Sequence, residues 1–208
     1  MKGLHMDATY FSIAIKGIII CLSAYSLHIK TGLPLQVKKT AFLFFTTLNT
    51  VACFTYFIFA LALDESRVMR QINGGVMLCA IITMSVYHFV LIPNIRKHLD
   101  HRIFSLPDIV VHYAIPLLVV IDWLLFSEKG YFTYYSPFLW YAPFIVYFIA
   151  VVISARCGVY LEYAKSRYPY YFIDYDKLGL LKVTRNAALM FIGVIGLGYI
   201  LVFIDNLL

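Results

Sequence analysis

Charged residues are scarce in this chain of 208 residues. Asp, Glu, Lys and Arg together make up 13% of it, about half of their share in an ordinary soluble domain. Hydrophobic residues make up 62%, and the mean hydropathy is +0.82. Too few polar side chains remain to cover the surface of a soluble protein of this size. The composition therefore excludes a soluble enzyme and predicts an integral membrane protein.

Cysteine is also rare, and its spacing does not suggest metal chemistry. The four residues Cys21, Cys53, Cys79 and Cys157 are far apart, and no CxxC pair occurs. Zinc sites and disulfide frameworks depend on closely spaced or regularly paired cysteines. We therefore expect these side chains to pack as small apolar groups. The sequence implies neither a metal ion nor an organic cofactor.

Long apolar runs, in contrast, occur along the whole chain. A helix needs about 20 predominantly apolar residues to cross a bilayer, and the sequence contains six such runs. The expected spans are 8–28, 41–62, 73–93, 106–126, 138–160 and 187–207. We therefore predict an all-α bundle of about six transmembrane helices, forming a single membrane domain over residues 1–208.

The basic residues are distributed unevenly between the two ends of these spans. The formal net charge is +6, and twelve of the 17 Lys and Arg residues lie on the first, third and fifth connections. They are Lys30, Lys38, Lys39, Arg96, Lys97, Arg102, Arg156, Lys165, Arg167, Lys177, Lys182 and Arg185. The positive-inside rule predicts that these connections are cytoplasmic and that both termini are not. In a bacterium the membrane would be the inner one. We expect this charge to contact membrane lipids and not nucleic acid.

Many of the 17 Tyr and 17 Phe residues cluster near the ends of the spans. The connection after the fifth span carries Tyr160, Tyr163, Tyr168, Tyr170, Tyr171 and Tyr175. Aromatic residues are typical of the headgroup region of a bilayer. We interpret these tyrosines as interface anchors.

Three polar residues stand out inside the apolar spans. Asp108 and His112 lie one helical turn apart in the fourth span, and Thr46 lies in the second. Ionisable groups inside a membrane are costly and are commonly functional. If Thr40 and Ser105 cap their helices, Thr46 and His112 each lie roughly 10 Å from the same end of the bundle. The two side chains are expected to meet if their helices are neighbours.

A hydroxyl, an imidazole and a carboxylate in this order suggest acyl transfer. Thr46 would be the nucleophile and His112 the base, while Asp108 would accept a hydrogen bond from the second ring nitrogen of His112. Further polar residues near this depth are candidates for holding the substrate or an oxyanion. These are Asn49, Thr47 and His88.

Structural explanations compete with each of these roles. A threonine inside a membrane helix usually donates to its own backbone one turn earlier, and Thr47 competes with Thr46 as the nucleophile. The Asp108–His112 pair is also compatible with a structural hydrogen bond between helices. His88 lies near the end of its span, where interface residues are common. From the residues alone, we infer a polar pocket that opens toward the cytoplasm.

Two segments resemble a known family. Phe45-Thr46-Thr47-Leu48-Asn49 and His112-Tyr113-Ala114-Ile115-Pro116 are similar to the androgen-induced-protein family of membrane hydrolases and its bacterial six-helix relatives. The resemblance implies that an intramembrane threonine, Thr46, and a histidine, His112, cleave fatty acid esters of hydroxy fatty acids. It implies no cofactor, and a lipid substrate that enters from the membrane.

The sequence thus predicts a threonine-dependent lipid esterase. Two other classes stay open: a proton-coupled transporter in which Asp108 and His112 relay protons, and a lipid-binding membrane protein without catalysis. The absence of an inverted repeat or of paired broken helices disfavours a transporter. The oligomeric state is left open.

Overall fold

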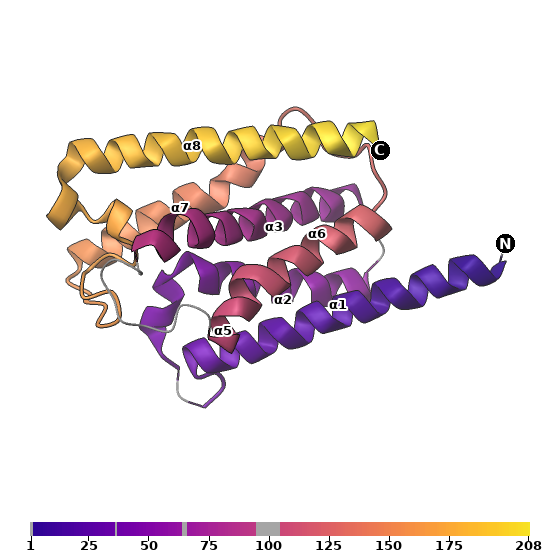
Figure 1. The fold of residues 1–208 in the computed structure, drawn as a ribbon, viewed down its shortest axis with the longest axis horizontal. Coiled ribbons are helices and arrows are strands. Elements are labelled where there is room, and N and C mark those ends of the chain that lie inside the picture. Colours follow the sequence, from indigo (N-terminus) through magenta and orange to yellow (C-terminus); the bar gives the residue numbers. More distant parts are fainter. Residues whose placement is uncertain (1, 36, 64–65, 95–104) are drawn as a thin grey trace.

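The computed structural model describes residues 2–35, 37–63, 66–94 and 105–208. Within them all regular secondary structure is helical, apart from one isolated bridge between Leu161 and Ser166. Six of the described helices are long and apolar enough to span a membrane, and they pack together in one bundle (Figure 1). The chain is therefore an all-α integral membrane protein, as its composition predicts.

Each of the six expected spans corresponds to a helical segment of the structure. The elements are α1 (Lys2–Thr31), α2 (Phe45–Ala62), α3 (Arg67–Val86), α5 (Leu106–Ile109), α6 (Ile115–Phe126), α7 (Ser136–Arg156) and α8 (Tyr175–Leu207). Two five-residue π-helical turns extend this set: Tyr87–Leu91 follows α3, and Val110–Ala114 joins α5 to α6. The third and fourth spans thus run over Arg67–Asn94 and Leu106–Phe126.

Two helices begin earlier than the hydropathy predicts, and polar caps explain both. The Ser66 hydroxyl accepts a hydrogen bond from the Met69 amide at 3.2 Å and starts α3. The Asp174 carboxylate accepts from the Lys177 amide at 3.1 Å and starts the first turn of α8, which a kink at Gly179 (φ 74°) separates from the long apolar part of the helix. Each cap satisfies a backbone N–H that the first turn of a helix leaves without a partner.

The start of α2 differs from the expectation. Residues Lys39–Leu43 form a short 3₁₀ turn, and Phe44 occupies the N-cap position of α2. Thr40 is therefore not the cap, and Thr46 lies in the first turn of α2 instead of deep within it. Ser105 does occupy the cap position of α5, but its hydroxyl donates to the Asp108 carboxylate at 2.6 Å.

α3 lies at the centre of the bundle, with α1 and α8 on opposite sides of it in Figure 1. It contacts α2, α6, α7 and α8. Two glycines allow α7 to approach closely, because a Cβ atom on Gly74 would lie 2.2 Å from the Trp140 ring and one on Gly75 3.1 Å from it. The Trp140 indole donates to the Gln71 carbonyl at 2.8 Å, which fixes the ring over these glycines.

α1 and α6 are joined by a buried ion pair. The Lys16 ammonium lies 2.8 Å from the Asp122 carboxylate and 2.6 Å from the Ser12 hydroxyl. Both charged side chains are almost completely removed from the surface. Charges in such surroundings need a partner, because neither lipid nor water solvates them there.

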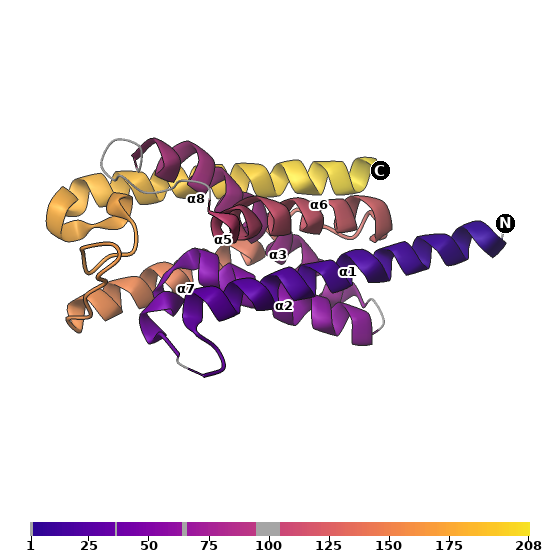
Figure 2. The same ribbon diagram turned by 60° about the horizontal axis from the view of Figure 1, so that its bottom comes forward.

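Both termini lie at one end of the bundle, and the first and fifth connections lie at the other (Figures 1 and 2). The basic residues expected on these two connections therefore gather at the end opposite the termini. Those of the third connection, Arg96, Lys97 and Arg102, lie outside the described residues.

Candidate functional site

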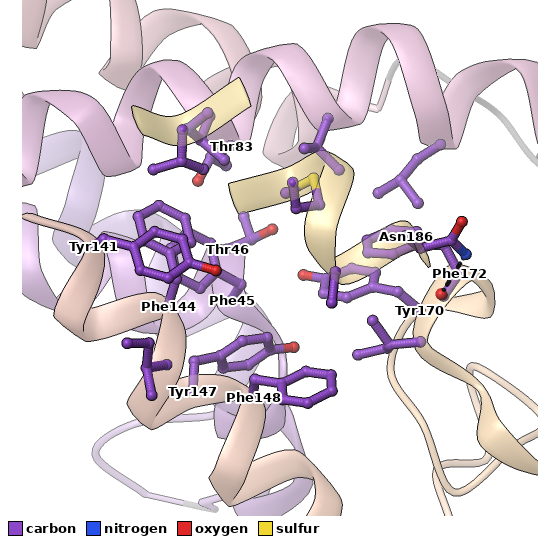
Figure 3. A pocket seen from close by; sticks show the side chains of 18 of the residues that line it. Phe45, Thr46, Thr83, Tyr141, Phe144, Tyr147, Phe148, Tyr170, Phe172 and Asn186 are labelled. Carbon is purple, nitrogen blue, oxygen red and sulfur yellow. Dashed lines mark hydrogen bonds between the residues drawn. The ribbon is translucent and has the colours of Figure 1, made fainter. Parts of the chain in front are cut away.

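A cavity of about 180 Å³ lies inside the bundle where α2 begins (Figure 3). Its walls come from α2, α3, α7, α8, the two π-helical turns and the segment that leads into α8. Most of the lining is apolar and aromatic, including Phe45, Ile82, Phe144, Phe172, Met190 and Val194. Such a lining suits a hydrocarbon chain, while a few polar groups can fix the orientation of a ligand.

Thr46 and His112 meet in the wall of this cavity. Thr46 Oγ1 lies 3.5 Å from His112 Nε2, and both residues are buried. The distance is at the long end of the hydrogen-bond range, which is common for catalytic pairs before a substrate binds. The predicted meeting of these two side chains is therefore present, although Thr46 reaches it from the first turn of its helix.

Two π-helical turns, which face each other, position the histidine. His112 lies in the turn Val110–Ala114 and Tyr87 begins the turn Tyr87–Leu91. Their rings stack with centroids 3.6 Å apart and planes inclined by 7°. Pro116 follows closely and has no N–H to donate to the helix. Single π turns inside α-helices are frequent at functional sites.

The predicted role of the Asp108 carboxylate is wrong. His112 Nδ1 donates to the backbone carbonyl of Asp108 at 2.9 Å. The carboxylate of Asp108 is directed elsewhere, with the Ser105 hydroxyl at 2.6 Å and the Lys30 ammonium at 3.5 Å. Because a carbonyl oxygen only accepts, Nδ1 carries the proton and Nε2 of the neutral ring is left as the acceptor that faces Thr46.

The other predicted polar residues lie outside the cavity. Thr47 and Asn49 are buried but do not line it, and the Asn49 amide oxygen lies 4.0 Å from the Cys53 sulfur. His88 is exposed, and its Nδ1 lies 2.9 Å from the Tyr113 hydroxyl. The neighbouring Tyr87 lies against His112 instead. The structure thus brings together Thr46 and His112 but not Asn49, Thr47 or His88.

Two tyrosines that sequence reasoning did not assign to the site lie beside Thr46. Figure 3 shows the hydroxyls of Tyr147, from α7, and Tyr170, from the connection to α8, both directed into the cavity. Tyr170 lies in the run Tyr168-Pro169-Tyr170-Tyr171-Phe172, interpreted above as an interface belt. Only the folding of this connection over the bundle distinguishes Tyr170 from its neighbours.

The surroundings of Tyr170 set its protonation state. Burial raises the pKa of its phenol. The phenol is therefore neutral at physiological pH and available as a hydrogen-bond donor.

Among the described residues, no group of three His, Cys, Asp or Glu side chains is placed to hold a metal ion.

These features define a class: an integral membrane protein with a threonine–histidine pair in a largely apolar cavity. Comparison of the chain with protein-family models, curated proteins and solved structures gave no significant match.

Proposed function

We propose that this protein is a membrane-embedded hydrolase of fatty-acyl esters, with Thr46 as the nucleophile and His112 as the general base. The observation that carries the proposal is the approach of Thr46 Oγ1 to His112 Nε2 at 3.5 Å in the wall of an apolar cavity. A hydroxyl beside a correctly oriented imidazole is the recurring arrangement of acyl-transfer enzymes.

The reaction has two stages. His112 Nε2 removes the Thr46 hydroxyl proton while Oγ1 attacks the ester carbonyl, and the same proton then passes to the departing alkoxide. An acyl-threonine and a free alcohol result. In the second stage His112 takes a proton from water, the hydroxide attacks the acyl carbonyl, and the proton returns to Thr46 as the fatty acid leaves.

The cavity indicates which part of a lipid is bound inside the bundle. A volume of about 180 Å³ is close to that of a cavity that holds benzene, so it accommodates an ester group and a few neighbouring carbons. Ile145 of α7 lines the cavity and is also half-exposed on the outer surface of the bundle. We propose that longer chains extend past Ile145 into the bilayer.

The alternative of a proton-coupled carrier is weakened by the position of Asp108. That hypothesis needs a proton relay between the Asp108 carboxylate and the imidazole of His112. The ring instead bonds to the Asp108 backbone, and the carboxylate faces Lys30 and Ser105. The main alternative is a lipid-binding protein without catalytic activity. The substitutions described next distinguish it from an esterase.

Paired substitutions test the proposal on protein purified in detergent. The measurements are hydrolysis of a p-nitrophenyl ester of a medium-chain fatty acid and labelling by a fluorophosphonate. Thr46→Ala and His112→Ala are each expected to lower kcat at least about a thousand-fold, and the double variant should be little worse, because the two groups act as a unit.

Matched controls come from the neighbouring residues that lie outside the cavity. Thr47→Ala and His88→Ala should keep both activity and labelling. Turnover that persists in Thr46→Ala, or a wild-type protein that neither hydrolyses the ester nor reacts with the probe, would overturn the assignment as an esterase.

A further inference from the structure

The pair of Thr46 and His112 accounts for nucleophile and base but not for the charge on the substrate. Attack on an ester places a negative charge on the carbonyl oxygen, and acyl-transfer enzymes stabilise it with fixed hydrogen-bond donors. Asn49, the residue expected to do so from its place in the sequence, lies outside the cavity. Another donor has to lie next to Thr46.

We propose that the Tyr170 phenol is this donor and binds the oxyanion that forms when Thr46 attacks an ester. The inference rests on the proposed function and names a third catalytic residue for it. Figure 3 shows the Tyr170 hydroxyl directed into the cavity toward Thr46. Thr46 and Tyr170 both line the cavity.

The arrangement of protons explains how the Tyr170 phenol can face Thr46 in the free protein and the oxyanion during the reaction. The Thr46 proton is directed to His112 Nε2, so a lone pair of Oγ1 is open to the proton of the Tyr170 phenol. When Oγ1 forms its bond to the carbonyl carbon, it loses electron density for this hydrogen bond. The carbonyl oxygen then lies about 1.3 Å from that carbon and takes over the same donor. Tyr170 keeps its proton throughout.

Three other polar groups in the cavity wall already donate to backbone carbonyls. The Tyr147 phenol donates to the Leu43 carbonyl at 3.0 Å, and the Thr83 hydroxyl donates to the Cys79 carbonyl at 2.8 Å. The Asn186 amide donates to the Phe172 carbonyl at 2.8 Å. Compared with these groups, Tyr170 is the better placed to turn its proton toward a substrate.

The segment that carries Tyr170 is held firmly on both sides. Before it, the Ser166 hydroxyl donates to the Asp174 carboxylate at 2.7 Å, and Tyr168 is buried against α7. After it, Ile173 packs into the same small core. Oxyanion donors are effective when the protein fixes them before the reaction, since no reorganisation is then needed.

The decisive variant is Tyr170→Phe, which removes one hydroxyl and keeps the ring. Its kcat should fall by about 10²–10³-fold, as for the loss of one oxyanion donor, with KM little changed. Fluorophosphonate labelling of Thr46 should slow in parallel, because the phosphonyl oxygen occupies the oxyanion position. Tyr171→Phe is the matched control, since its hydroxyl lies outside the cavity, 3.4 Å from the Val90 carbonyl, and it should retain wild-type rates.

A fluorinated tyrosine at position 170 gives a second readout that a packing role would not change. It has nearly the same shape but a lower phenol pKa, so the activity should acquire a fall on the alkaline side that wild type lacks. A kcat of Tyr170→Phe within threefold of wild type, or an unshifted pH profile with the fluorinated residue, would overturn the inference. If Thr46→Ala still abolishes turnover in that case, the proposed function survives and only the role of Tyr170 is lost.

Discussion

The ring of Tyr87 lies flat against the imidazole of His112, with centroids 3.6 Å apart and planes inclined by 7°. Together with the hydrogen bond from His112 Nδ1 to the Asp108 carbonyl, this contact fixes both the plane and the rotation of the imidazole. One π-helical turn thus carries His112, and the other carries the Tyr87 ring that packs against it.

Removing this stack should lower turnover without unfolding the protein. Tyr87→Leu is expected to reduce kcat about 10- to 100-fold, because a displaced catalytic group loses much of its effect. Tyr87→Phe keeps the ring and should retain most of the activity. Steady-state kinetics with thermal unfolding in detergent measures both quantities, and equal kcat values for Tyr87→Leu and Tyr87→Phe would contradict a role for the stack.

Replacement of the Asp108 carboxylate should have little effect on catalysis. Asp108→Asn preserves the backbone carbonyl that accepts from His112, so kcat should stay within about threefold of wild type. The half-exposed pair with Lys30 contributes about 0–1 kcal/mol of stability, as such pairs usually do. A large fall in kcat with unchanged melting temperature would instead restore the carboxylate to the mechanism.

The ion pair between Lys16 and Asp122 should be strongly coupled. Asp122→Leu or Lys16→Met alone leaves a buried charge without its ionic partner and should cost about 3–5 kcal/mol of stability. The double variant Lys16→Met/Asp122→Leu removes both charges and should recover most of that loss. Denaturation in mixed micelles measures the three values, and purely additive losses would show that the pair is not coupled.

Close packing between α3 and α7 makes Gly74 intolerant of a side chain. Gly74→Ala places a Cβ 2.2 Å from the Trp140 ring, so the helices must separate, at a cost of about 1–3 kcal/mol. Gly17→Ala is the control, because no atom beyond its own stretch of helix backbone lies within 4 Å of the added Cβ. It should be neutral or slightly stabilising, and similar melting temperatures for the two variants would contradict the packing argument.

Orientation in the membrane is predicted from charge. Because twelve of the 17 basic residues lie on odd connections, a C-terminal reporter active only outside the cytoplasm should be active. A reporter active only in the cytoplasm would contradict this orientation and place Thr46 and His112 at the opposite leaflet.

The spans could be predicted from the sequence, because they depend on hydropathy. The meeting of Thr46 with His112 was also predicted, but from a helix start at Thr40 that the structure does not have, because α2 begins at Phe45. The contribution of Asp108 could not be predicted, since the choice between its carboxylate and its carbonyl depends on Ser105 and Lys30. The place of Tyr170 was also hidden, because no periodicity connects an irregular segment to a cavity. The pairing of Asp122 with Lys16 in the first span could not be predicted either, because the sequence does not show which helices are neighbours.

The pairing of Lys16 with Asp122 has a consequence for biogenesis. The two residues are 106 positions apart in the chain, so during synthesis the first span emerges long before its counter-ion exists. A lone ammonium at the centre of a helix adds about 2.5–3.5 kcal/mol to membrane insertion. We expect α1 to settle in the bilayer only once α6 has arrived. Nascent chains that end before Asp122 should therefore leave a cysteine introduced beside Lys16 open to water-soluble thiol reagents, and chains that include α6 should protect it.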